Sequence, residues 1–294
     1  MTDQMTDNGN IIKSSYIRDT VQRFLRHKLA MAALCFLLIQ VILIIALPIT
    51  MGLDPYTSAA GGFRAPPSAE HLLGTDTVGR DVLARLIAGA QTSLFVGLIS
   101  SLISFSIGVP LGLLAGYFRG WIEIVVMRLA DIAMSFPSII LILVLVSVVG
   151  PSINSVAVII GVMSWPVFAK LLFSNVISVR EKDYVEAARA AGARNFTIIL
   201  KFILPNSFAP VLVAFTFRMA EAIIQESTLS FLGLGVQPPS ASLGNILHAA
   251  QSVAILTRNP WMWIPAGVVL VLTIMSINFL GDGIRDALDP KMKI

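Results

Sequence analysis

The sequence predicts an all-α integral membrane protein with six transmembrane helices. Of its 294 residues, 56% are hydrophobic and 13% are charged, whereas roughly a quarter of the residues in a soluble domain are charged. A bilayer core about 30 Å thick requires roughly 20 apolar residues per helix. Lipid offers no partner for backbone N–H and C=O groups, so spanning segments of this kind are helical. The predicted spans are residues 29–49, 91–117, 123–149, 154–175, 207–234 and 261–281.

The apolar runs divide the chain into four parts. Residues 1–28 are predicted to form a cytoplasmic N-terminal segment, and 29–49 an anchoring helix. This first run is longer than the apolar part of a signal peptide and lacks a small-x-small cleavage pattern, so we expect it to be retained. Residues 50–90 are predicted to form an extracytoplasmic loop, and 91–294 a core with the other five spans.

The distribution of Lys and Arg predicts the orientation. If the N-terminus is cytoplasmic, 16 of the 21 basic residues lie on the cytoplasmic side. Four lie opposite and one, Arg218, lies within a span; the four are Arg64, Arg80, Arg85 and Arg258. Cytoplasmic loops carry an excess of basic residues, so both termini are predicted to be cytoplasmic. The net charge of +4 therefore reflects topology, and a nucleic-acid partner is not expected.

Several kinds of chemistry are missing from the sequence. The chain has no Gly-Lys dipeptide, so it has no Walker A phosphate loop, and it has no H-E-x-x-H motif. Its single cysteine, Cys35, cannot form a disulfide framework, and His27, His71 and His248 are far apart. No nucleophile is paired with a base. We therefore expect no catalytic residue, metal or cofactor in this chain.

A polar island, EAARAAGARNFTIILKFILP over residues 186–205, separates the fourth and fifth runs. Residues 181–191 are mostly strong helix formers, so a short helix is predicted, and Gly192 can adopt the left-handed conformation that ends it. Asn195 is a suitable N-cap for a second helix over 196–203, and the proline that follows is expected to stop that helix.

The first of these helices has a surface suited to contact with another protein. Ala187 and Ala188 add almost no bulk, which lets a neighbouring backbone approach closely. Tyr184 supplies an aromatic anchor of the kind that dominates binding hot spots. The alternative is an ordinary hairpin at the membrane surface, and both interpretations stay open at this point.

The island is similar to the EAA loop of bacterial ABC importer permeases. That pattern is Glu-Ala-Ala, three residues, Gly, nine residues, Ile, one residue and Leu-Pro. The chain departs from it only at Phe202, which keeps the position apolar, and matches it at Glu186, Ala187, Ala188, Gly192, Leu204 and Pro205. Four further stretches resemble the C-type permease of the dipeptide/oligopeptide/nickel importer family: HLLGTDTVGRDVLARLIAGAQTSL (71–94), RLADIAMSFP (128–137), SFLGLGVQPP (230–239) and GDGIRDALDP (281–290).

The resemblance implies a type I ABC importer permease fold in a prokaryotic cytoplasmic (inner) membrane. The loop at about 178–206 would couple the spans to the ATPase through Tyr184, Glu186, Ala187, Ala188, Gly192, Leu204 and Pro205. The implied partners are a second, B-type permease, two ABC ATPase subunits that bind ATP and Mg, and an extracytoplasmic substrate-binding protein. Di- and oligopeptides are the expected cargo. The alternatives are an importer for nickel or another small solute, and an ATP-independent secondary transporter or channel.

The fifth span contains polar residues within apolar sequence. Arg218, Glu221 and Gln225 share a narrow stripe of the helix, with Glu226 at its margin, and Arg218 is spaced to pair with Glu221. A charge at mid-bilayer costs about 2.5 to 3.5 kcal/mol, so these groups should face protein or water. They are either a buried pair that holds the bundle together or candidates for the wall of the transport pathway.

Other residues are predicted to shape the outer side and the helix contacts. Phe231, Gly233 and Gly235 form a candidate gate facing a binding protein, or simply end the helix. In the outer loop, Asp76 and Asp81 are predicted to cap short helices or to contact that protein. Three glycines of the second span recur every four residues and are expected to allow close helix packing: Gly108, Gly112 and Gly116. Arg128 is expected to form an ion pair with Asp131 near the membrane surface.

Overall fold

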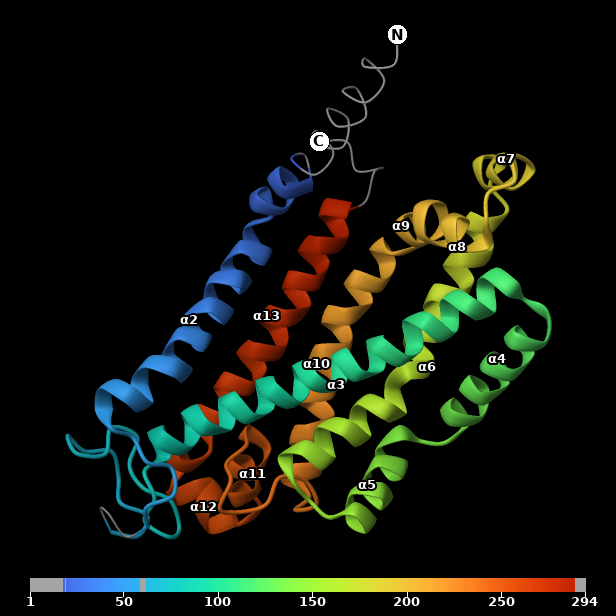
Figure 1. Ribbon diagram of the computed structural model, residues 1–294. Coiled ribbons are helices and arrows are strands. Elements are labelled where there is room, and N and C mark those ends of the chain that lie inside the picture. Colours follow the sequence, from blue (N-terminus) through green and yellow to red (C-terminus); the bar gives the residue numbers. More distant parts are fainter. Residues whose placement is uncertain (1–17, 19, 59–61, 289–294) are drawn as a thin grey trace.

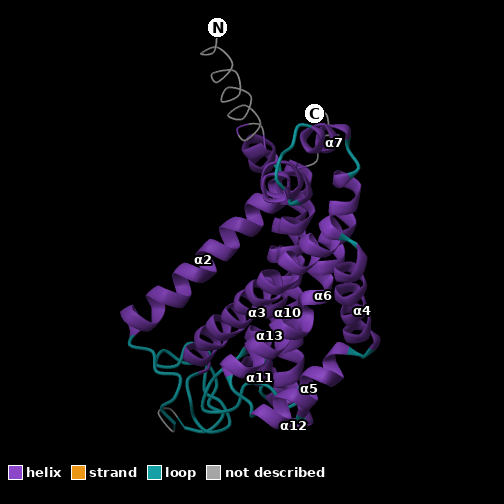
Figure 2. Ribbon diagram, turned by 45° about the vertical axis from the view of Figure 1, so that its right-hand side comes forward, coloured by secondary structure: helices purple, strands orange, loops and turns teal. Residues whose placement is uncertain are grey.

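The computed structural model describes residues 18, 20–58 and 62–288 and is built of helices joined by loops (Figure 1). Apart from an isolated bridge between Thr75 and Asp81, these residues contain no β-structure (Figure 2), which confirms the all-α prediction. Parts of the predicted N-terminal segment (1–17 and 19) and outer loop (59–61), and the C-terminal residues 289–294, lie outside the described residues.

Five long helices come first, and two groups of short helices then flank α10. The long ones are α2 (Lys28–Met51), α3 (Val82–Phe118), α4 (Gly120–Ser135), α5 (Ser138–Val149), α6 (Ile153–Arg180), α10 (Ala209–Phe231) and α13 (Ile264–Leu288). The short ones are α7 (Asp183–Ala190), α8 (Asn195–Ile198), the π-helical turn η1 (Ile199–Ile203), α9 (Leu204–Ser207), α11 (Leu243–His248), η2 (Ala249–Gln251), α12 (Val253–Arg258) and η3 (Pro260–Met262).

Four helical segments of the described chain are long and apolar enough to cross a membrane, and the number rises to six if each of two bent helix pairs is one span. The third predicted span, 123–149, is not the continuous helix that the sequence suggested. It consists of α4 and α5, which meet at an angle of 86°. Phe136 is extended, with φ of −100° and ψ of 143°, because the residue before a proline is disfavoured in the helical region. Pro137 therefore marks the break.

The core of the bundle is the contact between α3 and α6, which run side by side in the same direction. Gly108, Gly112 and Gly116 of α3 make this contact possible. A Cβ atom on Gly112 would lie 2.4 Å from the carbonyl oxygen of Ala169, and one on Gly108 would lie 2.4 Å from that of Trp165. The predicted close packing through small residues is confirmed.

At 37 residues, α3 is about 55 Å long and begins well before the predicted span 91–117. Asp81 caps it, accepting a hydrogen bond from the Ala84 N–H at 2.8 Å, so the predicted cap is present but belongs to a long helix and not to a short one. The other aspartate predicted as a helix cap, Asp76, instead holds a turn, where its Oδ1 accepts from the N–H groups of Val78 and Arg80 at 2.9 and 3.0 Å.

The first and last long helices lie together on one side of the bundle (Figure 1). In the middle of this contact the buried Gln40 donates from Nε2 to Thr273 Oγ1 at 2.9 Å. At one end, His27 Nε2 lies 3.3 Å from Asp286 Oδ2. The start of α2 and the end of α13 are thus at the same end of the bundle, which Figure 1 shows to be the end that carries α7.

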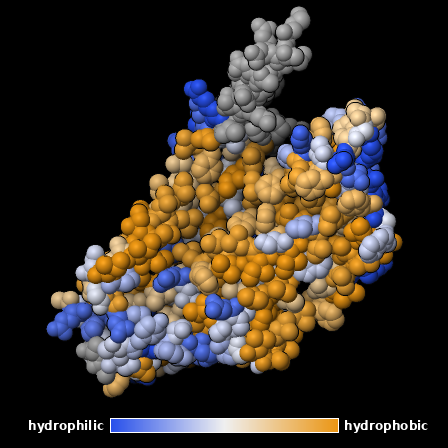
Figure 3. Space-filling model, in the orientation of Figure 1, coloured by the Kyte–Doolittle hydropathy of each residue, from blue (hydrophilic) through white to orange (hydrophobic). Residues whose placement is uncertain are grey.

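The surface has the pattern expected of a membrane-spanning bundle. Figure 3 shows a broad apolar belt over the long helices and polar residues gathered toward the two ends. Exposed apolar side chains, among them Ile42, Leu102 and Val271, are 60%, 42% and 54% accessible. Large exposed apolar surfaces in a folded chain indicate lipid or a partner subunit.

Candidate functional site

The short helix α7 ends in a sharp left-handed turn, as predicted. Gly192 has a φ of +78°, and its N–H donates to the carbonyl oxygen of Arg189 at 3.0 Å. The N–H of Ala193 donates to the carbonyl oxygen of Ala188 at 3.1 Å. These two bonds form a Schellman motif, which satisfies carbonyl groups at a helix C-terminus. A Cβ atom on Gly192 would meet no atom within 4 Å, so the need for glycine comes from backbone conformation.

One residue anchors α7 while its neighbours face outward. Val185 is fully buried in a cluster that includes residues of α3, α6 and α10. Tyr184 is 43% exposed, and Glu186 and Ala187 are also exposed. Phe196, which the sequence analysis did not single out, is 71% exposed on α8. This segment therefore exposes two aromatic rings beside a surface of small residues.

A cavity of about 240 Å³ lies between α7 and the ends of α3 and α6. Charged side chains line it, including Arg119, Arg180 and Arg189 together with Glu181 and Glu186. Within the described residues Arg119 pairs with Glu123 at 3.3 Å, but Glu186 has no ion-pair partner. The glutamate of the EAA pattern therefore lines a cavity rich in arginine without forming an ion pair in the described part of the chain.

The expectation that Asn195 caps the second helix is wrong. Arg194 occupies the N-cap position, and Asn195 is the first residue inside α8. Its Oδ1 accepts a hydrogen bond from the Tyr117 hydroxyl at 2.7 Å. Because Tyr117 is at the end of α3, this bond ties the loop to a long helix outside the predicted hairpin.

Pro205 does not stop the second helix. The Leu204 N–H bonds to the carbonyl oxygen of Ile199, five residues back, in the π-helical turn η1. Pro205 then falls in the first turn of α9, where its missing N–H disrupts no bond. The chain stays helical from α8 to α9 and bends by 58° before α10. Leu204 and Pro205 therefore lie in the helical segment that runs from α8 to α9, one bend before α10.

In the middle of α10, Arg218 and Glu221 form the predicted ion pair. Arg218 is buried and also donates to Ser164 Oγ of α6 at 2.6 Å. The Glu221 side chain is 50% exposed, whereas that of Arg218 is 9% exposed. Gln225 is buried one turn further, with its Nε2 atom 3.4 Å from Glu221 Oε1. The pair therefore presents its acidic member to the surface.

Glu221 lies on an open stripe of α10. Phe217, Ile224 and Phe231 on the same stripe are 36%, 46% and 38% exposed. These three residues recur every seven positions, and Glu221 lies four residues after the first and three before the second, so all four share one face of the helix. A half-exposed carboxylate in the middle of a span requires protein or water beside it, because lipid cannot solvate it.

Glu226 has a different environment, although it is only five residues further along. It is fully buried, and its carboxylate accepts hydrogen bonds from Ser93 Oγ of α3 at 2.9 Å and from Ser230 Oγ at 2.7 Å. Ser227 Oγ lies 3.3 Å away. In this conformation Glu226 connects helices inside the bundle and is not on the open stripe.

The candidate gate lies where α10 ends. The carbonyl oxygen of Phe231 accepts from Gln251 Nε2 and from His248 Nδ1, both at 2.7 Å. Gly233 has a φ of +78°. A Cβ atom on Gly235 would lie 2.3 Å from Ser230 Oγ, so the chain turns back directly against the last turn of α10. These contacts connect the gate segment to the short helices that follow it.

One charged pair between two long helices was not predicted. Asp131 of α4 pairs with Lys170 of α6 at 2.6 Å, and not with Arg128 as expected from the sequence. The two side chains are 51% and 38% exposed, the acid again being the more accessible. This pair fixes α4 against α6 just before the bend at Pro137.

The three histidines lie apart in the structure. His27 pairs with Asp286 near the start of α2, His71 Nδ1 lies 2.8 Å from Asp81 Oδ2 in the outer loop, and His248 bonds to a backbone carbonyl. Among the described residues, no group of three or more His, Cys, Asp and Glu side chains is placed to hold a metal ion.

Comparison with known proteins places this architecture in a family. Residues 108–294 match the family described as binding-protein-dependent transport system inner membrane component. Residues 15–67 match the N-terminal TM domain of oligopeptide transport permease C. Together the two matches cover most of the chain.

Curated relatives align over almost their whole length. The glutathione transport system permease protein GsiD of Pectobacterium atrosepticum is 38% identical over 281 residues, which are 94% of this chain and 91% of the relative. The dipeptide transport system permease protein DppC of Alkalihalophilus pseudofirmus is 37% identical over 276 residues, which are 94% and 90% of the two chains.

Solved structures share the fold. A chain of the MetNI methionine ABC transporter in an inward-facing conformation superposes with a TM-score of 0.59 at 23% identity, over 70% of this chain and 98% of that chain. A chain of an amino acid ABC transporter superposes with a TM-score of 0.54 at 15% identity, over 69% and 94% of the chains. The chain is a permease component of an ABC importer and belongs to the family of binding-protein-dependent transport system inner membrane components.

Proposed function

We propose that this chain is one of two transmembrane subunits of an ATP-driven, binding-protein-dependent importer of di- and oligopeptides in a prokaryotic cytoplasmic membrane. A second, B-type permease would complete the pathway, and two ABC ATPase subunits would bind and hydrolyse ATP with Mg. The names of the relatives, which specify dipeptide and glutathione transport, support a peptide cargo.

The α7 end of the bundle is assigned to the cytoplasm. Most of the Lys and Arg residues are at this end, in agreement with the excess of basic residues expected on that side. The contact of His27 with Asp286 brings the start of the first span and the end of the last span to the same end. Both termini are accordingly proposed to be cytoplasmic.

The observation that carries the proposal is the way in which α7 is attached. Val185 is buried against α6 and α10, whereas Tyr184, Glu186, Ala187 and Phe196 face outward. The loop continues through the helical segment α8 to α9 and, after a bend of 58°, into α10. A displacement of α7 by an ATPase subunit would therefore be transmitted to α6 and α10, because no long unstructured linker separates them from α7.

The pathway is proposed to run along the open stripe of α10. Glu221 would receive the protonated amino terminus of a peptide, because its carboxylate is half exposed at mid-span. Arg218 would hold that carboxylate in place, and Gln225 supports it from the next turn. Glu226, with its serine partners, would contribute to the pathway only in a conformation that opens the interior of the bundle.

Reconstitution tests this function. The chain with its B-type permease and both ATPase subunits should import peptides into liposomes only when ATP and a cargo-binding protein are supplied. A photocrosslinker at Ala187 should capture an ATPase subunit, and one at Leu102, on the apolar belt, should not. Uptake without any ATPase subunit would identify an ATP-independent transporter, and selective uptake of nickel would identify a different cargo.

A further inference from the structure

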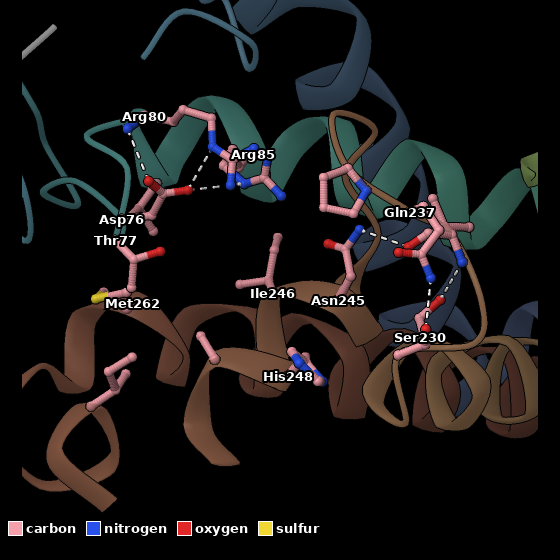
Figure 4. A pocket seen from close by; sticks show the side chains of 16 residues that line it. Asp76, Thr77, Arg80, Arg85, Ser230, Gln237, Asn245, Ile246, His248 and Met262 are labelled. Carbon is pink, nitrogen blue, oxygen red and sulfur yellow. Dashed lines mark hydrogen bonds and ion pairs between the residues drawn. The ribbon is translucent and has the colours of Figure 1, made fainter. Parts of the chain in front are cut away.

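The end of the bundle opposite α7 contains a cavity of about 370 Å³. Three segments that are distant in the sequence form it: the outer loop with the start of α3, the end of α10, and the stretch from α11 to η3 (Figure 4). Asp76 and Arg80 lie on one wall, Arg85 projects from α3, and Asn245 and His248 line the opposite side (Figure 4).

The charges in this cavity do not balance. Arg80 Nε lies 2.8 Å from Asp76 Oδ2, and Arg85 Nε lies 3.5 Å from the same oxygen. The other oxygen of Asp76 is occupied by backbone N–H groups. Asp76 is the only carboxylate among the described residues that line the cavity. Two guanidinium groups therefore share one carboxylate, which leaves one positive charge in excess.

Burial makes this excess costly. Arg85 is 5% exposed, and apart from Asp76, the only partner found for it in the described part of the chain is the carbonyl oxygen of Pro239, 3.5 Å from its Nη1. It also lies one turn from the N-terminus of α3, where the helix dipole is positive. A buried cation with incomplete partners is stabilised by an anion, and the planar guanidinium binds a carboxylate with two parallel hydrogen bonds.

We propose that this cavity receives an acidic side chain of the extracytoplasmic binding protein when that protein docks. The inference rests on the proposed function, and it adds the place and the chemistry of the contact. The cavity is formed by outer segments and not by the middle of the spans, which favours a docked protein over a peptide in transit. Its volume is sufficient for a whole Asp or Glu side chain on a protruding loop.

Such a contact would be connected to the gate. Ser230 lines the cavity, accepts a hydrogen bond from the Val236 N–H at 3.0 Å, and donates to Glu226 inside the bundle. Gly233 lines the same cavity. A carboxylate that draws Arg85 and its surroundings together would change the packing against the end of α10, where the open stripe terminates.

The test uses the assembled complex in nanodiscs and the binding protein that stimulates its wild-type uptake. Counting Asp76, Arg80 and Arg85, the cavity has a charge of about +1 in the wild type, 0 in Arg80→Gln and +2 in Asp76→Asn. Asn keeps the Oδ1 acceptor for the backbone N–H groups. We expect Arg80→Gln to weaken docking about tenfold and Asp76→Asn to tighten it about threefold.

The double variant should bind about as tightly as the wild type, because its charge is restored. Arg258→Gln removes an exposed charge from the same end, outside the cavity, and should have little effect. If Asp76→Asn weakens docking as much as Arg80→Gln, the cluster only supports the fold and the inference is wrong. The inference is also wrong if all variants bind the binding protein equally tightly. It is wrong, too, if the variants leave docking unchanged and alter only the uptake of peptides with a free carboxyl terminus, because the cavity would then bind the peptide. Failure of the proposed function is separate, since it would abolish ATP-driven uptake in the wild type.

Discussion

Replacing Gly192 should separate coupling from folding. The residue has a φ of +78°, and a Cβ atom there would contact nothing within 4 Å. A substitution therefore causes no clash and acts only through the backbone. For a residue with a side chain, the left-handed conformation costs about 1–2 kcal/mol, and the cost is highest for β-branched residues. A loss of that size reduces the population of the native turn about 5- to 30-fold.

The turn directs the chain from α7 into α8, so its loss should uncouple the loop from α10. We expect Gly192→Val to insert in the membrane and to pair with the B-type permease normally, but to lose most peptide-stimulated ATP hydrolysis and uptake. Gly192→Asn is the matched control, because Asn tolerates the left-handed region. It should retain most of the activity.

The assay compares ATPase rate and uptake in proteoliposomes at equal amounts of assembled complex. Crosslinking from Ala187 to the ATPase subunit reports docking independently. If Gly192→Val transports as well as the wild type and docks equally, the coupling role of this turn is refuted. If Gly192→Val and Gly192→Asn lose activity equally, backbone strain is not the cause of the loss.

Two other predictions concern the spans. Gly112→Val should lower the thermal stability of the detergent-solubilised complex by about 1–3 kcal/mol, because its Cβ would lie 2.4 Å from a backbone oxygen of α6. Gly267→Ala should leave the stability unchanged, because the atom nearest to its Cβ would be 3.6 Å away. Equal losses of stability in the two variants would disprove the explanation by close packing. Neutralising Glu221 and Glu226 together should reduce the uptake of peptides with a free amino terminus about 10- to 100-fold. This factor corresponds to the free energy of one hydrogen bond to a charged group. Unchanged uptake by a folded variant would show that these acids do not line the pathway.

The sequence predicts the local features of this chain well, because they depend on neighbouring residues. Apolar runs determine where helices lie, Asp81 caps α3, and Gly192 ends α7. The pair of Arg218 with Glu221 follows from helix geometry alone. In each case the partners are at most a few residues apart, so no knowledge of the fold is needed.

Prolines show where local reasoning fails. Pro110 and Pro166 lie inside α3 and α6 without ending them, whereas Pro137 separates α4 from α5. Pro205 is accommodated because a π-helical turn precedes it. Whether a proline breaks a helix depends on whether neighbouring helices satisfy the freed backbone groups, and that is a property of the assembled bundle.

Contacts between distant helices were equally beyond reach. Asp131 was expected to pair with Arg128, three residues away, but pairs with Lys170 on α6. The serine at position 93 reaches Glu226 across 133 residues. Each contact depends on the rotation of one helix about its axis relative to another, which the apolar runs do not specify.

The polar groups of the helical bundle differ in their exposure, and the difference indicates which faces of the helices cannot meet lipid. Glu226 and Gln40 are buried with their hydrogen-bond partners. Glu221 and Asp131 also have partners within this chain, but their side chains are about half exposed. Each charge left in lipid would cost about 2.5 to 3.5 kcal/mol, a large fraction of the stability of a typical fold. The face of α10 that carries Glu221 must therefore meet protein or water rather than lipid.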